Sequence, residues 1–154
     1  MEHLTGLQPI TLITTGRTGS DFLQSLLDSH TEVLTFNAII WIHDFWKKSK
    51  CVSNNINLSD LIDEFIGLNI EKFKSRYDIT ERKDCLGDSG NEHIDIDLKD
   101  FKSKVQFLLN DFEVTSKNFL LAIYGAYALC LQHDLLKKKI LFHHIHHAER
   151  LPDY

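Results

Sequence analysis

The amino-acid sequence predicts an α/β fold in which a parallel β-sheet is flanked by helices, and three observations support this. Segments with the composition of strands alternate with segments of helical periodicity, which is the order found in layered α/β domains. The segments 10–15 and 140–145 are rich in β-branched or apolar residues, as expected of strands buried in a parallel sheet. The chain has 154 residues, 43% of them hydrophobic, which suits one domain spanning 1–154.

A glycine loop joins the first predicted strand to the first predicted helix. The run of Ile, Thr and Leu at 10–15 is typical of a strand buried on both faces. Gly16 and Gly19 interrupt it, and Ser20 or Thr18 can cap the helix that follows. Apolar residues then recur at helical spacing, which predicts an amphipathic helix: Phe22, Leu23, Leu26 and Leu27.

The later elements follow from helical spacing, capping residues and glycine-rich breaks. In chain order we predict a strand at 32–36, a helix at 38–48, a helix beginning at Ser59, a loop at 85–91, a helix at 97–111, an apolar helix from Thr115 or Ser116 to about His133, and a central strand at 140–145.

Charge and cysteine content limit the partners and the compartment. The formal net charge of -5 argues against nucleic acid, because domains that bind it usually carry a clearly basic surface. The widely spaced Cys51, Cys85 and Cys130 favour reduced thiols over a disulfide framework or a zinc site. No segment has the character of an export signal or of a transmembrane helix. We therefore expect a cytoplasmic protein without a transmembrane segment.

The residues of the glycine loop suit a phosphate or sulfate group. At a strand-to-helix junction an anion is held by backbone N–H groups and by the positive end of the helix dipole. Gly16 and Gly19 let the backbone approach such an anion, and Arg17 supplies a planar fork of donors. Thr18 and Ser20 add hydroxyl donors. The sequence thus predicts an anion-binding loop.

Two common nucleotide loops do not fit these residues. The triphosphate-binding loop needs Lys and then Ser or Thr after its second glycine, whereas Ser20 and Asp21 follow Gly19. The dinucleotide fingerprint needs a third glycine or alanine in the helix, and that position is Phe22. A metal-dependent NTPase and a Rossmann dehydrogenase are both disfavoured.

The same segment resembles the opening of a known family, the sulfotransferases. These enzymes follow their first strand with a basic residue, Ser or Thr, Gly, hydroxyl residues and an apolar pair. The matching residues are Arg17, Thr18, Gly19, Ser20, Phe22 and Leu23, followed by LQSLLDSHTEV. The resemblance covers 9–36 and implies a P-loop-like three-layer sandwich.

By that resemblance, the loop binds the sulfate donor 3′-phosphoadenosine 5′-phosphosulfate (PAPS) without a metal. The residues that would hold its 5′-phosphosulfate are Gly16, Arg17, Thr18, Gly19, Ser20, Asp21 and Phe22. Arg17 would also steady charge on the bridging oxygen while the sulfuryl group passes to a hydroxyl acceptor, which would be a carbohydrate, a lipid or a small molecule. Asp21 departs from the family, where a second hydroxyl residue is common. Its carboxylate either points away from the anion or weakens donor binding.

A histidine-rich strand supplies the candidates for a catalytic base. The period of two places His144 and His146 on one face, and His143 and Ile145 on the other. Sulfotransferases have a similar histidine near the end of a strand and before a Leu-Pro pair, so the resemblance makes His144 or His146 the base. The alternative to a catalytic base is that these histidines are structural or simply exposed. A metal cluster completed by His43, Asp44 or Glu149 has no recognised spacing, and we expect no metal.

Two other side chains are candidates for an acceptor pocket. His43 and Trp41 could line one, whereas the simpler interpretation is that Trp41 packs in the core with Phe45 and Trp46.

The end of the sequence bears on activity and on association. In the family, the 3′-phosphate of the donor is bound by an Arg and a Ser beyond the segment that corresponds to 151–154, so we expect a partial, apparently truncated domain of doubtful independent activity. An exposed apolar sheet edge would favour self-association. The alternative functions are a non-catalytic anion- or nucleotide-binding module and, less favoured because the Lys is absent, a P-loop phosphotransferase.

Overall fold

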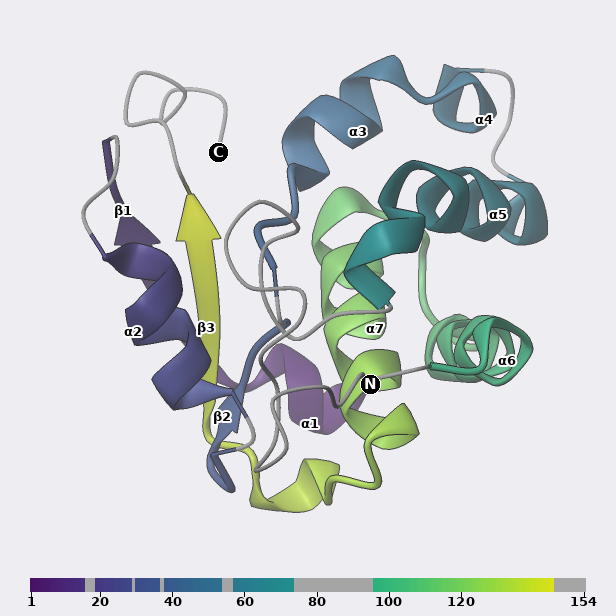
Figure 1. Ribbon diagram of the computed structural model, residues 1–154. Helices are drawn as coiled ribbons and strands as arrows, with labels where there is room; N and C mark the ends of the chain where they lie inside the picture. The colour runs from purple at the N-terminus through teal and green to yellow at the C-terminus, as the bar shows by residue number, and fades with distance from the viewer. Residues whose placement is uncertain (16–18, 29, 37, 54–56, 74–95, 146–154) are drawn as a thin grey trace.

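The computed structural model describes residues 1–15, 19–28, 30–36, 38–53, 57–73 and 96–145, except for the side chains of Asp21 and Ser25 (Figure 1). Its strands are β1 (Gln8–Ile13), β2 (Val33–Leu34) and β3 (Ile140–Ile145), and they form a parallel sheet in the order β1-β3-β2. The predicted α/β class with a parallel sheet and flanking helices is confirmed. The predicted strand at 140–145 is confirmed with its bounds, and it is the central one of the three.

The register brings the carboxyl ends of β1 and β3 together. Gln8 lies opposite Ile140 and Ile13 opposite Ile145, so the two strands run side by side over their whole length. The Thr14 N–H extends the ladder by donating to the Ile145 carbonyl at 3.0 Å. Ligands of parallel sheets usually bind outside the carboxyl ends of the strands, so this edge is the first place to look for a site.

Helices cover both faces of the sheet, and adjacent residues of β3 contact one helix each. His144 contacts Gln24 of α2 (Ser20–Leu27), and His143 contacts Tyr124 of α7 (Ser116–Cys130). Neighbouring side chains of a strand point to opposite faces. Helices α2 and α7 therefore lie on opposite sides of β3, as Figure 1 also shows.

Helix α7 is the centre of the helical half of the molecule. Every residue from 121 to 128 is buried, as expected of a helix that is apolar on all sides. Its Gly125 permits close packing, because a Cβ there would lie 2.7 Å from Leu4 Cδ1 and 3.0 Å from Leu108 Cδ1. The remaining helical elements surround it: α1 (Glu2–Thr5), α3 (Ile42–Lys48), α4 (Lys50–Ser53), α5 (Leu58–Asn69), η1 (Ile70–Phe73), α6 (Leu98–Leu109) and η2 (Leu135–Lys137).

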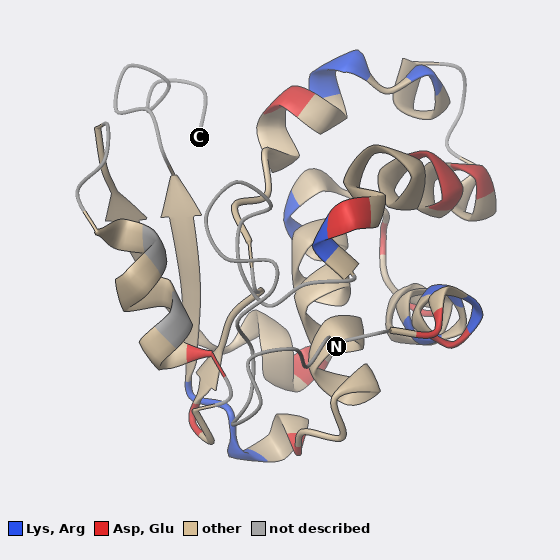
Figure 2. Ribbon diagram, viewed as in Figure 1, with Lys and Arg blue, Asp and Glu red and all other residues tan. Residues whose placement is uncertain are grey.

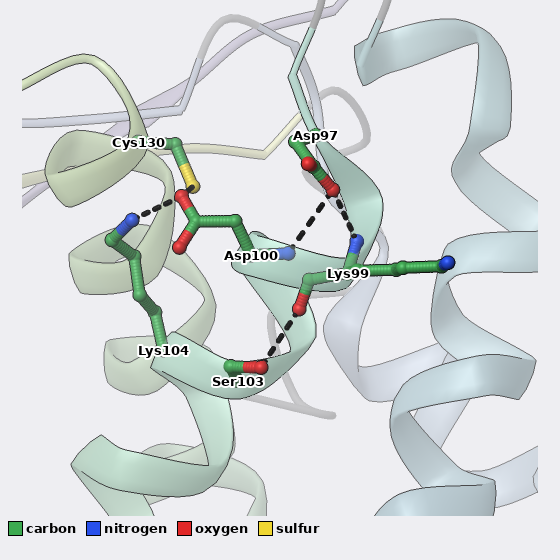
Figure 3. A network of polar contacts seen from close by, with 6 residues as sticks. All are labelled: Asp97, Lys99, Asp100, Ser103, Lys104 and Cys130. Carbon is green, nitrogen blue, oxygen red and sulfur yellow. Dashed lines mark hydrogen bonds and ion pairs between the residues drawn. The ribbon is translucent and has the colours of Figure 1, made fainter.

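Polar contacts fix α6 against α7 (Figure 3). The Asp97 carboxylate caps α6 by accepting from the backbone N–H groups of Lys99 at 2.8 Å and Asp100 at 3.2 Å. Asp100 forms an ion pair with Lys104 and accepts from the Cys130 thiol of α7 at 3.6 Å. Burial raises the pKa of Cys130 to about 12, so this thiol stays protonated.

The prediction for the first strand is wrong in its burial. The strand runs from Gln8 to Ile13 rather than over 10–15, and Ile10 and Ile13 are 42% and 41% exposed. The reason is position, because β1 is an edge strand of the described sheet. A β-branched composition fits an edge strand as well as a central one.

The amphipathic face predicted for α2 forms, but it points outward. Phe22 and Leu26 are 68% and 61% exposed, whereas the buried positions are the polar Ser20 and Gln24. Helix α2 lies beside β1, which is the edge strand of the described sheet (Figure 1). Figure 2 shows no charged residue on β1.

The other elements differ from the predictions mainly at their ends. The helices predicted at 97–111 and from Thr115 or Ser116 to about His133 are α6 and α7, with ends a few residues earlier. The strand at 32–36 shortens to two residues, and the helix at 38–48 begins only at Ile42. The predicted loop at 85–91 lies outside the described residues. Within the described ranges, no helix has both the length and the hydrophobicity to cross a membrane.

Candidate functional site

The candidate site lies where β1 and β3 end and α2 begins. We call it the strand-end site and define it by five residues: Thr14, Gly19, Ser20, Gln24 and His144. His144 is far from the other four in the sequence. The parallel pairing of β1 with β3 brings it beside Thr14, and its contact with Gln24 ties it to α2.

Gly19 sets the start of α2. It is the N-cap residue and adopts the left-handed conformation, with φ 76° and ψ 16°, which L side chains rarely adopt. Its carbonyl accepts the first helical hydrogen bond, from the Leu23 N–H at 3.1 Å. Ser20 follows and is 5% exposed. The N-terminal end of α2, with the donor groups of its first turn, thus begins beside the ends of the strands.

Gln24 anchors a polar network beneath that helix start. Its Nε2 donates to the Phe36 carbonyl, which fixes the orientation of the amide and leaves Oε1 as the acceptor. His144 Nδ1 lies 3.0 Å from this Oε1, and His144 Nε2 lies 3.0 Å from the Thr14 hydroxyl. Because Oε1 can only accept, Nδ1 carries the proton. In the neutral ring, Nε2 then accepts the proton of the Thr14 hydroxyl.

This arrangement can take a proton from a hydroxyl group. A hydroxyl bonded to an imidazole nitrogen, with the other nitrogen held by a third group, is the general arrangement of an activated oxygen. His144 is 2% exposed, whereas Thr14 is half-buried. Of the two side chains, that of Thr14 is the more accessible to a molecule at the strand ends.

His143 belongs to the core on the opposite side of the sheet. Its side chain is 7% exposed, and its Nδ1 lies 2.8 Å from the Tyr124 hydroxyl. Burial, with a smaller contribution from the neighbouring His144, lowers the pKa of His143 to about 4. The ring is therefore neutral at physiological pH.

The structure brings only part of the predicted residue set together. Gly19, Ser20 and His144 lie at the strand-end site, whereas Phe22 is 68% exposed on the outer side of α2. Asp21 is in the first turn of α2, and nothing is described of its side chain. The predicted residues that lie outside the described part of the chain are Gly16, Arg17, Thr18 and His146.

The metal hypothesis finds no assembled site in the described ranges. No three His, Cys, Asp or Glu residues of those ranges are grouped so that they could hold a metal ion. His43 and Asp44 lie in α3, while Glu149 is outside the described residues.

Sequence reasoning missed Thr14 and Gln24. A signal for Gln24 was present, since it is polar and lies between Leu23 and Leu26, which were assigned to the apolar face of the helix. Thr14 could have been singled out as a hydroxyl residue at a strand end, immediately before a glycine loop. Their partnership with His144 spans 130 and 120 residues, so no local pattern shows it.

Comparison with known proteins leaves the site to be interpreted from its own chemistry. No family model, no curated protein and no solved structure matches this chain. The fold and the site define an α/β protein with a hydroxyl–imidazole–amide network at the ends of its parallel strands.

Proposed function

We propose that this chain is a sulfotransferase-type protein that binds PAPS in the loop after β1 and passes the sulfuryl group to a hydroxyl acceptor. The observation that carries the proposal is the strand-end site, where α2 starts at a left-handed glycine and its Gln24 holds the buried imidazole of His144. A helix start binds an anion, and an imidazole accepts a proton, so the site has both parts that this transfer needs.

The donor would lie against the start of α2. The backbone of Gly19 and Ser20 would donate to the 5′-phosphosulfate, with Gly16 and Thr18 completing the loop. Arg17 would steady the negative charge that develops on the bridging oxygen. A P-loop-like three-layer sandwich is part of this proposal, and the location of α2 and α7 on opposite faces of β3 supports it.

The transfer itself needs a base for the acceptor hydroxyl. The acceptor oxygen would bond to sulfur, and the bond from sulfur to the bridging oxygen would break, leaving 3′-phosphoadenosine 5′-phosphate. The acceptor proton would pass to the Thr14 oxygen while the Thr14 proton passes to His144 Nε2, which lies 3.0 Å from that oxygen. His146 stays the second candidate for the base.

Donor binding and transfer can be tested separately. Calorimetric titration with PAPS and with 3′-phosphoadenosine 5′-phosphate should give saturable heat. The variant Arg17→Ala should bind PAPS about tenfold more weakly or worse, because it loses hydrogen bonds to a charged group. Absence of heat with both nucleotides would remove the proposal.

Turnover is measured with radiolabelled PAPS and a panel of sugar, lipid and phenol acceptors. Thr14→Val should lower turnover at least about tenfold while leaving PAPS affinity unchanged. Thr11→Val is the matched control, because Thr11 is an exposed threonine on the same strand. Equal turnover in the two variants would exclude the Thr14–His144 relay.

A second candidate function, a non-catalytic anion- or nucleotide-binding module, is favoured by one observation. His144 is 2% exposed and both of its ring nitrogens have hydrogen-bond partners, as in a structural histidine. Such a module would bind the two adenine nucleotides without transferring sulfate. A phosphotransferase would instead bind ATP with magnesium, so a parallel titration with ATP and magnesium distinguishes it from both other functions.

A cytoplasmic location goes with the proposal, in keeping with free thiols at Cys51 and Cys130.

A further inference from the structure

A second candidate site is a cavity between α3 and α5, separate from the strand-end site. Its volume is about 240 Å³. The floor is apolar and buried, with Ile40, Phe45 and Phe65 at 2%, 8% and 0% exposure. Trp41, half-buried, forms part of the wall. A largely apolar cavity with a few polar groups is the usual form of a small-molecule site, and this one has room for a single ring.

Four charged side chains complete the wall, two of each sign. The carboxylates are Asp44 and Glu64, and the ammonium groups are Lys48 and Lys72. Figure 2 shows this mixture of signs along α3 and at the end of α5 and η1. The four formal charges sum to zero, so a ligand need not bring a net charge of its own.

Two of these charges are held in position by neighbouring polar groups. The Ser49 hydroxyl, 3% exposed, donates to Glu64 Oε2 at 2.6 Å, and this hydrogen bond is the main reason that the pKa of Glu64 is lowered. The Lys72 ammonium donates to the Ile39 carbonyl at 2.6 Å. An acceptor and a donor are thus fixed in the wall of the cavity.

We propose that the cavity binds a single sugar ring. A hydroxyl group both donates and accepts, so a ring of hydroxyls can add hydrogen bonds to carboxylates and ammonium groups together without bringing a net charge. The C–H face of such a ring can pack on the Trp41 indole and the apolar floor. The proposal does not rest on sulfuryl transfer, because no residue of the strand-end site lines the cavity.

The two tryptophans make binding measurable. Trp41 lines the cavity, whereas Trp46 packs against Phe119 at a centroid distance of 5.9 Å. In the Trp46→Phe protein, Trp41 is the only fluorescent indole. Its emission should change saturably with methyl β-D-glucopyranoside, methyl β-D-galactopyranoside or N-acetylglucosamine at millimolar concentrations.

Saturation-transfer NMR then tests the site without a tryptophan reporter. Trp41→Ala should weaken binding of the same sugar about tenfold or more, and Trp46→Phe should leave it unchanged. Asp44→Asn should weaken it about tenfold, with Asp111→Asn as the control for loss of an exposed carboxylate. Circular dichroism of each variant checks the fold.

Three outcomes would overturn the proposal. One is the lack of a saturable response to all three sugars. Another is sugar binding that Trp41→Ala leaves unchanged, because the sugar would then bind outside this cavity. The third is a response to the zwitterion leucine or to phenol but to no sugar, which would assign the cavity to another class of ligand.

Discussion

The stability of this protein should fall as the solution is acidified from pH 7 to pH 4, and His143 is the group to test. Burial between β3 and α7 lowers its pKa from 6.5 to about 4 in the folded chain. The unfolded chain therefore binds a proton at a pH where the folded chain does not. Stability from this group is fully present above pH 6.5 and is lost as the pH falls towards 4.

The size of this effect follows from the two pKa values of His143. With 6.5 for the unfolded chain and about 4 for the folded chain, linkage gives a loss of about 2 kcal/mol at pH 5 and about 3 kcal/mol at pH 4. Both losses are a considerable fraction of the ~5–15 kcal/mol by which a domain is usually stable. Carboxylates and other histidines also titrate in this range, so the contribution of His143 must be isolated by a variant.

The variant His143→Gln removes the titration but keeps a polar group beside the Tyr124 hydroxyl. Urea unfolding followed by circular dichroism at pH 7, 6 and 5 gives the free energy of unfolding of both proteins. The variant should be less stable at pH 7 and should lose about 2 kcal/mol less than the natural chain by pH 5. Tyr124→Phe is the control, because it removes the hydrogen bond but leaves His143 buried. Parallel pH dependences for His143→Gln and the natural chain would refute burial as the cause.

Three further predictions concern other parts of the chain. Gly19→Ala should lower the free energy of unfolding by about 1–2 kcal/mol, because the φ of Gly19 is 76°. Gly67→Ala should raise it by about 0.5–1 kcal/mol, because Gly67 lies inside α5 with nothing within 4 Å of the added Cβ. Thermal unfolding that shows both variants stabilised, or both destabilised, would contradict this. Cys130 has a pKa of about 12 against an ordinary 9.0, so its thiolate is scarce, although a more basic thiolate is also more nucleophilic. Cys130 should therefore react with iodoacetamide about tenfold to 100-fold more slowly than a free thiol. Rapid labelling of Cys130, detected by mass spectrometry, would argue against its burial. The double variant Phe22→Ser and Leu26→Ser should reduce concentration-dependent association in analytical ultracentrifugation, because both side chains are more than half exposed. An unchanged sedimentation profile would show that this surface does not cause the association.

The elements that could be predicted from the sequence are those whose signals are local. Helix α6 begins at a side-chain cap from Asp97 and α7 at one from Thr115, and each cap lies beside the helix it starts. Strand β3 is a short apolar run that follows three lysines and is central in the described sheet. Such signals need no knowledge of distant parts of the chain.

The faces of β1 and α2 could not be predicted, because they depend on what lies beside them. The same apolar positions of α2 would be buried under a wider sheet and are exposed over the edge strand β1. For the strand-end site, the glycine and histidine patterns pointed to Gly19 and His144, but the contacts of His144 with Thr14 and Gln24 depend on the pairing of β1 with β3. Long-range pairing is the information that local patterns lack.

The orientation of α2 and the strand-end site have one explanation. An imidazole buried at 2% exposure, like that of His144, needs hydrogen-bond partners, since a buried polar group without them costs about 1–3 kcal/mol. Gln24 meets that need only if α2 turns its Ser20–Gln24 side toward β3, and the amide is locked there by the Phe36 carbonyl. Residues 22, 23 and 26 lie on the other side of the helix and must then face outward. The exposed apolar surface of α2 is therefore a direct consequence of the contacts that hold His144 in place beside Thr14.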